Sequence, residues 1–139
     1  MELKTVKRSD HQFLYDMLKE RTEKTNISHQ HMPEWEDHLK FCNSKPYKIW
    51  LIGWERHFKV GMCYLTDRNE IGVFIKDGFR RRGYAKEMIE HLIKQAEGSV
   101  LANINPTNRV SRRMFSNLDF WPVQVTYKKK RDLDSGQKV

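Results

Sequence analysis

The stretch EIGVFIKDGFRRRGYAKEMIEHLIKQA, residues 70–96, decides the fold because three local patterns follow one another in it. Alternate residues from 71 to 75 are apolar, as on one face of a strand. A basic turn, RRRGYA, follows at residues 80–85. From 85 to 96 apolar residues recur at helical spacing. The stretch therefore predicts a strand, a basic turn and an amphipathic helix in direct succession.

The basic turn lies where the predicted helix begins, which is a favourable place for a pyrophosphate. A helix N-terminus offers free backbone N–H groups and the positive end of the helix dipole. Three arginines precede Gly83, and Lys86 follows it. A glycine lets the backbone approach a phosphate without a side chain in the way. These residues predict a ligand that carries phosphate groups.

The spacing R-x-x-G-x-A resembles the acetyl-CoA signature of the GNAT superfamily of N-acetyltransferases, Q/R-x-x-G-x-G/A. A second segment, residues 103–120, resembles the pattern N-x-x-[SA]-x-x-x-[YF]-x-x-x-G-F of the same family. Asn108, Ser111 and Phe115 fill this pattern, and Asp119 stands where the family has glycine. An aspartate is tolerable there because it adopts left-handed backbone more readily than most residues. An ordinary helix N-cap remains an alternative reading of Asn108.

The resemblance implies an α/β (α+β) GNAT fold, a mixed central sheet of about six strands with about four helices, splayed at the acetyl-CoA site. We expect one domain over residues 1–128 and a basic, flexible tail over 129–139. The expected strands are 2–6, 47–54, 59–66, 70–76, 100–104 and 123–128, and the expected helices begin near Ser9 or span 33–42, 82–97 and 108–118. The segment 22–32 reads as a loop.

In this family a free amine attacks the thioester of acetyl-CoA directly, so acetyl-CoA is the implied donor. Backbone N–H groups of the strand before the phosphate loop hold the pantetheine arm. The cofactor-binding residues that the resemblance implies are Val73, Ile75, Arg80, Arg81, Arg82, Gly83, Tyr84, Ala85, Lys86, Asn108, Ser111 and Phe115. Gly72 inside this strand indicates either a bulge that creates the splay or close packing of a neighbouring aromatic ring.

The attacking amine must be neutral, so a base has to accept its proton. Glu70 opens the strand where one branch of the family has a catalytic glutamate, and it is our first candidate. His29 is a second candidate base, since a neutral imidazole accepts protons near neutral pH. The pair His29 and His31 has no further ligand cluster nearby in the sequence, so we expect no metal. Phe115 stands where many relatives have a tyrosine acid, which leaves Tyr84, Tyr127 or water to protonate the thiolate.

The acceptor is less well defined by the sequence than the donor. The segment around residues 26–50 resembles small GNAT proteins of nucleotide-sugar and polysaccharide pathways, which implies an amino group on a nucleotide-linked sugar. Candidate acceptor contacts are His31, Trp35 and Tyr64. Alternatives are acetylation of a protein N-terminus or lysine, a CoA-binding module without turnover, and a basic nucleic-acid-binding domain.

The composition is that of a small basic protein of 139 residues with a formal net charge of +8. A cationic surface suits a polyphosphate ligand, whereas the basic residues do not alternate with aromatic residues as in single-strand binders. No apolar run reaches membrane-spanning length, so we expect no membrane partner. Cys42 and Cys63 are expected to be buried, reduced thiols of a cytoplasmic protein. We expect a monomer or a homodimer.

Overall fold

The computed structural model describes residues 1–24 and 32–131. Two compact units divide the chain, Met1–Asn105 and Pro106–Val139, and we describe each by itself. His29, His31 and most of the expected tail lie outside the described residues. Within those residues, no helix is both long enough and apolar enough to cross a bilayer.

The first unit is built on a five-stranded sheet in the order β1-β2-β3-β4-β5. Neighbouring strands are antiparallel from β1 to β4, and β5 runs parallel to β4. The sheet is therefore mixed, as expected, with one strand fewer than the expected six. The strands are β1 (Glu2–Thr5), β2 (Ile49–Glu55), β3 (Phe58–Leu65), β4 (Glu70–Ile75) and β5 (Leu101–Ala102).

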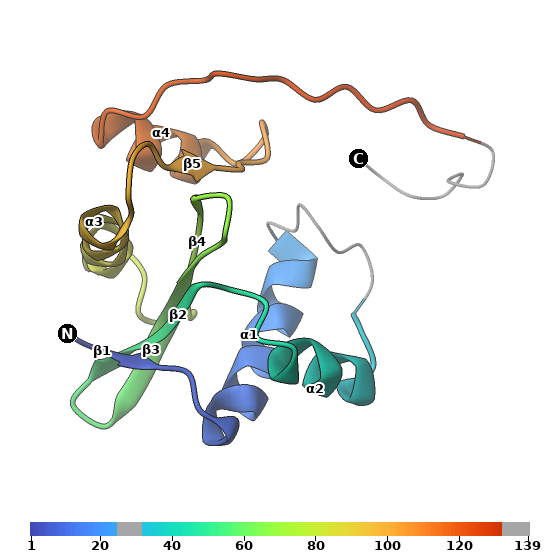
Figure 1. Cartoon of the computed structure of the whole chain (residues 1–139), viewed down its shortest axis with the longest axis vertical. Coiled ribbons are helices and arrows are strands. Elements are labelled where there is room, and N and C mark those ends of the chain that lie inside the picture. The colour runs from blue at the N-terminus through green and yellow to red at the C-terminus, as the bar shows by residue number, and fades with distance from the viewer. Residues whose placement is uncertain (25–31, 132–139) are drawn as a thin grey trace. The chain divides into compact units, whose positions relative to one another are not determined.

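Helices cover both faces of this sheet. In Figure 1, α1 and α2 lie on one side of the strands and α3 lies on the other. The two sides have different cores. The buried residues of α3 are Met88, Ile89 and Leu92, whereas α1 and α2 bury the polar residues His11 and His38 together with Leu14, Met17 and Cys42. The helices of the first unit are the short η1 (Arg8–Asp10), α1 (His11–Lys24), α2 (Trp35–Asn43) and α3 (Tyr84–Gln95), and the second unit contains α4 (Arg109–Asn117).

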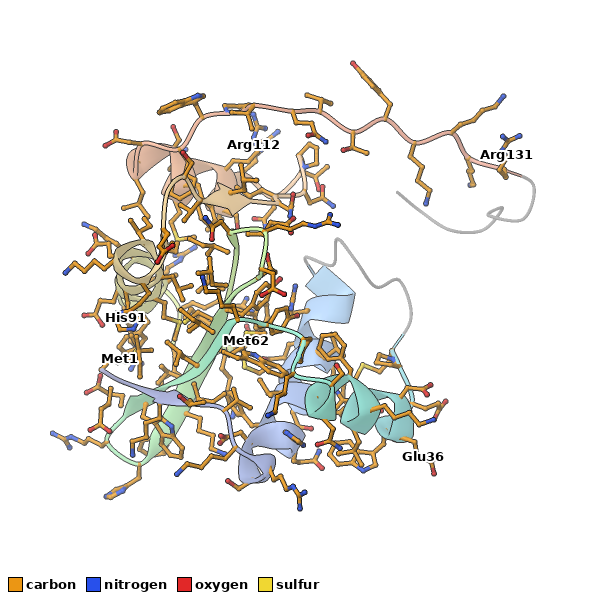
Figure 2. The ribbon with its side chains drawn as sticks, in the orientation of Figure 1. Met1, Glu36, Met62, His91, Arg112 and Arg131 are labelled. Atoms are coloured by element: carbon orange, nitrogen blue, oxygen red, sulfur yellow. The ribbon has the colours of Figure 1, made fainter. Side chains whose placement is uncertain are left out.

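The α3 face is a dry aliphatic core. Met88, Ile89 and Leu92 are fully buried, as the helical spacing predicts. The opposite face holds a cluster in which Met62 of β3 packs with residues of α1, α2 and β4. Figure 2 shows Met62 in the interior and Glu36 on the outer side of α2. Partly buried aromatic residues surround this second cluster, namely Phe13, Trp50, Trp54 and Tyr64.

The start of α1 is fixed to the sheet by a buried carboxylate. The Lys7 N–H donates to the Asp10 carboxylate over 2.8 Å, and Asp10 forms an ion pair with Lys59 Nζ of β3 at 2.8 Å. The charge of the buried Asp10 is therefore compensated by a cation and by a backbone donor. The helix then continues to Lys24, beyond the residue at which the polar composition predicted a loop.

Histidine and cysteine side chains meet between α1 and α2. His38 Nε2 lies 3.0 Å from the backbone oxygen of His11 and 3.5 Å from Cys42 Sγ. Burial lowers the pKa of His38 below its usual value. Burial also raises the pKa of Cys42 to about 11 and that of Cys63 to about 12. Both cysteines are free and buried, as the sequence predicted.

The second unit is organised around the capped helix α4. The Asn108 side chain accepts a hydrogen bond from the Ser111 N–H at 3.1 Å, so the N-cap reading of Asn108 is confirmed. Asp119 follows the helix with φ 67, the left-handed conformation expected at this position. The rings of Phe115 and Phe120 meet edge to face, with centroids 5.0 Å apart.

The strand expected at residues 123–128 is not formed in the described part of the chain. Val123, Val125 and Tyr127 alternate as predicted, but the segment pairs with no strand and these side chains are 71%, 69% and 93% exposed. Alternation indicates that a segment fits a sheet, whereas a strand forms only where a partner supplies hydrogen bonds. The prediction of this strand was therefore wrong.

Candidate active site

One edge of β4 is open over most of its length. β5 pairs only with Glu70 and Ile71, so within residues 1–24 and 32–131 β4 has no partner on that side beyond Ile71. The Lys76 N–H donates to the Val60 carbonyl of β3, and the Thr66 N–H donates to the Glu70 carbonyl. The even-numbered residues of β4 therefore direct their backbone N–H and C=O groups toward β3. Val73 and Ile75 therefore direct their N–H groups toward the open edge. This is the splay that the sequence predicted, and it results from the shortness of β5.

The phosphate loop between β4 and α3 presents further backbone donors. Arg81 and Gly83 have φ 64 and φ 83, left-handed values that are typical of concave N–H nests. The first N–H to bond within this end of α3 is that of Glu87, which donates to the Gly83 carbonyl. The N–H groups of Tyr84, Ala85 and Lys86 thus have no intrahelical partner. A Cβ on Gly83 would meet nothing within 4 Å, so the approach to these donors is unobstructed.

Arg80 has a structural task in this loop. Its Nε donates to the Ile75 carbonyl at 3.0 Å, and its guanidinium pairs with Asp77 at 3.0 Å. The guanidinium also lies over the Phe74 ring, 5.1 Å from the centroid. Arg80 therefore ties the loop back onto β4. Arg81 and Arg82 are exposed, and they are better placed than Arg80 to meet a phosphate group.

The Glu70 carboxylate is held in place at the start of β4. Its Oε2 accepts a hydrogen bond from Asn103 Nδ2 at 2.8 Å, and its Oε1 accepts one from Thr66 Oγ1 at 3.3 Å. Asn103 follows β5, and the parallel pairing of β5 with β4 brings it to Glu70. Sequence reasoning missed Asn103, because nothing local signals a contact between residues 33 positions apart.

Gly72 is required by an aromatic ring. A Cβ at this position would fall inside the ring of Tyr64, its cross-strand neighbour on β3. The register between β3 and β4 is continuous from Gly61 to Leu65, so Gly72 makes no bulge. The close-packing alternative is therefore correct. The register shift of this sheet lies elsewhere, between β2 and β3 at Gly53.

Tyr64 belongs to an aromatic platform beside β4, which we define as Tyr47, Trp50 and Tyr64. The rings of Tyr47 and Tyr64 are stacked, with centroids 3.9 Å apart and planes 9° apart. Trp50 meets Tyr47 edge to face, and its buried indole N–H has no hydrogen-bond partner among the described residues. Burial raises the pKa of Tyr47, so this phenol stays neutral. An unsatisfied buried donor beside a flat ring pair is a place where a ligand oxygen is expected.

Two charged residues of α1 approach the same region, and sequence reasoning did not single them out. Arg21 lies over the Phe74 ring at 5.6 Å, and its charge lowers the pKa of the nearby Tyr47 in opposition to burial. Glu20 accepts a hydrogen bond from the Asp77 N–H at 3.2 Å through one oxygen, and its other oxygen is buried with no partner in the part of the chain that the structure describes. The sequence signal for both residues was their spacing of about one helical turn from Met17, which lies in the core.

The open edge of β4, the phosphate loop and the hydrogen-bonded carboxylate of Glu70 occur together in this chain. The model of the acetyltransferase (GNAT) family matches residues 12–120. The chain belongs to the GNAT family. It is therefore an acetyltransferase of this family, whose members take the acetyl group from acetyl-CoA. The free N–H groups of β4 and of the α3 N-terminus fit this donor, because an amide-rich arm and a pyrophosphate both bind backbone donors.

Solved GNAT structures share the fold at low sequence identity. The structure of yncA from Salmonella typhimurium, which includes its cofactor acetyl-CoA, has a TM-score of 0.72 at 16% identity and covers 85% of this chain and 78% of its own. A ribosomal-protein-alanine N-acetyltransferase from Brucella melitensis has a TM-score of 0.72 at 16% identity, with coverage of 85% and 83%. An aminoglycoside 6'-N-acetyltransferase from Acinetobacter haemolyticus has a TM-score of 0.68 at 19% identity, with coverage of 95% and 100%. No curated protein sequence matches significantly.

The remaining predicted residues of this GNAT protein are dispersed. Trp35 lies on α2, where it packs against Tyr15 and His38 rather than in the aromatic platform. The Tyr84 hydroxyl donates to Glu55 at 3.2 Å and so links α3 to β2. Asn108, Ser111 and Phe115 belong to the second unit. Among the described residues no group of three or more His, Cys, Asp and Glu side chains could hold a metal ion.

Proposed function

We propose that this GNAT enzyme acetylates a primary amine on a small acceptor that carries a flat ring and phosphate groups, an amino group on a nucleotide-linked sugar. The observation that carries the proposal is the stacked pair of Tyr47 and Tyr64 directly over Gly72 of the reacting strand. Gly72 and Tyr47 cover the two faces of the Tyr64 ring, so a base or a sugar ring would stack on the outer face of Tyr47. The backbone N–H groups next to Gly72 are those that would hold the thioester.

Charge supports an anionic acceptor. Arg21 stands beside the platform, and the whole chain has a formal net charge of +8. A nucleoside diphosphate would be attracted by this field, whereas a polycationic acceptor would be repelled. Among the acceptors named for structurally similar enzymes, an aminoglycoside is therefore the less favourable one for this chain.

We assign the role of general base to Glu70. Its carboxylate would accept the proton that the acceptor ammonium loses, directly or through one water molecule, before the nitrogen attacks the carbonyl carbon. The C–N bond then forms, the C–S bond breaks as CoA leaves as a thiolate, and the nitrogen releases its second proton to water to give the neutral amide. The hydrogen bonds from Asn103 and Thr66 would hold the carboxylate in a fixed orientation. His29 stays a rival base outside the described residues.

The leaving thiolate would take its proton from water. Phe115 has no hydroxyl, the Tyr84 hydroxyl is bonded to Glu55, and Tyr127 is 93% exposed in the second unit. A thiolate is a stable enough leaving group for this to suffice. The reaction would therefore depend on a base for the amine rather than on an acid for the sulfur.

The test is a comparison of acceptors in one assay. CoA release would be followed with a thiol reagent while the enzyme is offered a nucleoside-diphosphate amino sugar, the same amino sugar without the nucleotide, an aminoglycoside, and a peptide with a free N-terminus. We expect the highest kcat/KM for the nucleotide-linked amine. Equal rates with the free amino sugar, or a preference for the peptide or the aminoglycoside, would overturn the assignment.

A matched pair of variants links the acceptor to the platform. Tyr64→Leu removes the ring on which Tyr47 is stacked, so it should weaken the stack with the acceptor and raise the KM for the nucleotide-linked amine by roughly tenfold. Tyr15→Leu removes a ring from the α1–α2 side of the molecule and should leave this KM unchanged. An unchanged KM in Tyr64→Leu would exclude the platform as the acceptor site.

We also propose that the enzyme works in the cytoplasm. Two thiols, Cys42 and Cys63, are free and buried in different elements, an arrangement suited to a reducing compartment. Expression with a fluorescent tag and fractionation would test this location.

A further inference from the structure

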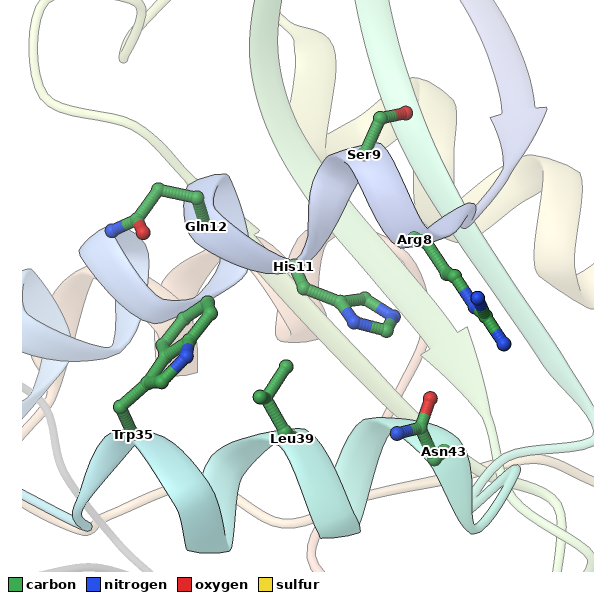
Figure 3. Close-up of a pocket in the computed structure, with 7 residues that line it drawn as sticks. All are labelled: Arg8, Ser9, His11, Gln12, Trp35, Leu39 and Asn43. Carbon is green, nitrogen blue, oxygen red and sulfur yellow. The ribbon is translucent and has the colours of Figure 1, made fainter.

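A groove between the start of α1 and the length of α2 lies apart from the active site. Its volume is about 490 Å³, which is in the range of small-molecule sites. Figure 3 shows the seven residues that line it, three of them from α2. They are Arg8, Ser9, His11, Gln12, Trp35, Leu39 and Asn43.

The groove contains a polar side chain that is mostly covered by protein. His11 is only 8% exposed, and its imidazole extends toward α2 between the two helices (Figure 3). The backbone oxygen of the same residue lies 3.0 Å from His38 Nε2 and links the two helices. The imidazole lines the groove, so a ligand bound there would meet a polar ring.

The polar lining is positive. The Arg8 guanidinium has no ion-pair partner among the described residues, and none of the lining residues is acidic. Asn43 adds an amide at the same end of the groove as Arg8 (Figure 3). An arginine with neighbouring neutral donors is a typical arrangement for a carboxylate or a phosphate.

The other part of the lining is apolar. Trp35 and Leu39 form it, and Trp35 is held by ring contacts with Tyr15 at 5.1 Å and His38 at 5.6 Å. An indole fixed in this way offers a rigid surface for a flat ring. The groove therefore combines an anion-binding end with an apolar surface.

The groove is remote from Glu70 in the sheet. Asp10, beside the groove, is bonded to Lys59 near the start of β3, whereas Leu65 at the end of β3 pairs with Ile71 next to Glu70. Six residues of strand separate the two ends, about 20 Å. No residue of β4 or of the phosphate loop lines the groove. A ligand bound there would not occupy the donor site.

We propose that this groove binds a small organic anion, a flat apolar ring that carries a carboxylate or a phosphate. The ring lies against Trp35 and Leu39, and the anion meets Arg8 and Asn43. His11 donates to or accepts from a polar atom between them.

The test uses four probes with the protein saturated with CoA, so that the donor site is filled. Phenyl phosphate and benzoate each combine a ring with an anion, inorganic phosphate lacks the ring, and phenol lacks the charge. Binding is followed by the NMR signals of the Trp35 indole N–H and the Asn43 amide. We expect saturable shifts of both signals with phenyl phosphate, benzoate or both, and the preferred one identifies the anion.

Two variants of equal charge change locate the site. Arg8→Gln should weaken binding of the preferred probe by roughly tenfold or more, the scale of a charge-assisted hydrogen bond. Lys94→Gln removes an exposed charge from α3 and should change the affinity by less than about twofold. Leu39→Phe, which fills the groove, should also abolish binding. Each residue is at least partly exposed, so folding is preserved, and thermal unfolding verifies it.

Three results would overturn the proposal. The first is the absence of saturable shifts with both ring anions. The second is equal affinity for inorganic phosphate or phenol, which would mean that ring and charge are not recognised together. The third is an unchanged affinity in Arg8→Gln, which would place the probe elsewhere.

Discussion

The proposed donor side and the proposed acceptor side of this enzyme are built from different parts of the chain. The proposed donor side uses backbone N–H groups, those of Val73 and Ile75 on the open edge of β4 and those at the start of α3. The proposed acceptor side uses side chains, the rings of Tyr47 and Tyr64 and the carboxylate of Glu70. A backbone site follows from local conformation, whereas a side-chain site depends on which residues the fold brings together. This difference explains why a short motif predicts the donor and leaves the acceptor open.

Two glycines summarise the contrast. Gly83 is left-handed and faces open space, so its task is to keep a ligand path clear. Gly72 is in an ordinary strand and is covered by Tyr64, so its task is to make room for a protein side chain. The same residue type therefore serves a ligand in one place and internal packing in the other.

The largest effect, a loss of kcat, is expected on the acceptor side, at Glu70. Glu70→Gln keeps the acceptor of the Asn103 hydrogen bond but cannot take a proton, so kcat should fall by about 10²-fold to 10⁴-fold. Acetyl-CoA affinity, measured by calorimetry, should stay within about twofold, because the donor is held by backbone groups.

Asn103→Ala is the companion variant for this carboxylate. It removes the residue that orients Glu70 and should lower kcat less than Glu70→Gln does. A normal kcat in Glu70→Gln would transfer the role of base to another residue, with His29 as the first to substitute.

The next largest effect, a loss of acetyl-CoA affinity, is expected on the donor side, at Gly83. Gly83→Glu places a negative side chain in the phosphate path and should weaken acetyl-CoA binding by at least about a hundredfold. Gly98→Glu is the matched control, because Gly98 is also left-handed, with φ 85, and also faces open space. Both variants strain the backbone alike, so equal loss of affinity would show that the phosphate loop has no special role.

A smaller effect separates the two glycines by stability. Gly72→Ala forces a methyl group against the Tyr64 ring and should lower the free energy of unfolding by about 1–3 kcal/mol in urea. The double variant Gly72→Ala with Tyr64→Leu should recover part of this loss, since the ring is gone. Absence of any recovery would mean that Gly72 is needed for its backbone rather than for its neighbour.

The smallest effect concerns the buried His38 between α1 and α2, and it depends on pH. Because the pKa of His38 is lowered in the folded protein, the unfolded chain binds this proton more readily below about pH 6.5. The stabilising contribution of neutral His38 is thus present above pH 6.5 and is lost as the pH falls toward the folded pKa. His38→Gln should flatten the decrease of the unfolding free energy over this interval, by up to about 1.4 kcal/mol per pH unit. An equal slope in wild type and variant would assign the titration to another group.

The elements around the donor site were predictable because their signals are local. The apolar period of α3, the alternation of β4 and the capping role of Asn108 each lie within about ten residues of chain. The family resemblance added their order. The splay at β4 was also predicted, but it results from the shortness of β5 rather than from a bulge at Gly72.

The acceptor side was less predictable because its contacts are distant in sequence. Glu70 is oriented by Asn103, and Tyr64 is stacked on Tyr47, across different strands and loops. Trp35, a candidate acceptor contact like Tyr64, packs against Tyr15 and His38. The segment 123–128 has the composition of a strand but lacks a partner. A periodic pattern shows which face of an element is apolar, and the partner of that face is decided by the whole chain.

The raised pKa values of Cys42 and Cys63 have a practical consequence for spectroscopy. With pKa values of about 11 and 12, both thiols are almost wholly protonated at neutral pH, and both are buried. Maleimides and iodoacetamides react with the thiolate, so neither residue competes with an exposed cysteine. A single cysteine introduced on the surface can therefore carry a fluorophore or a spin label while the natural thiols remain in place, and a cysteine-free background is unnecessary.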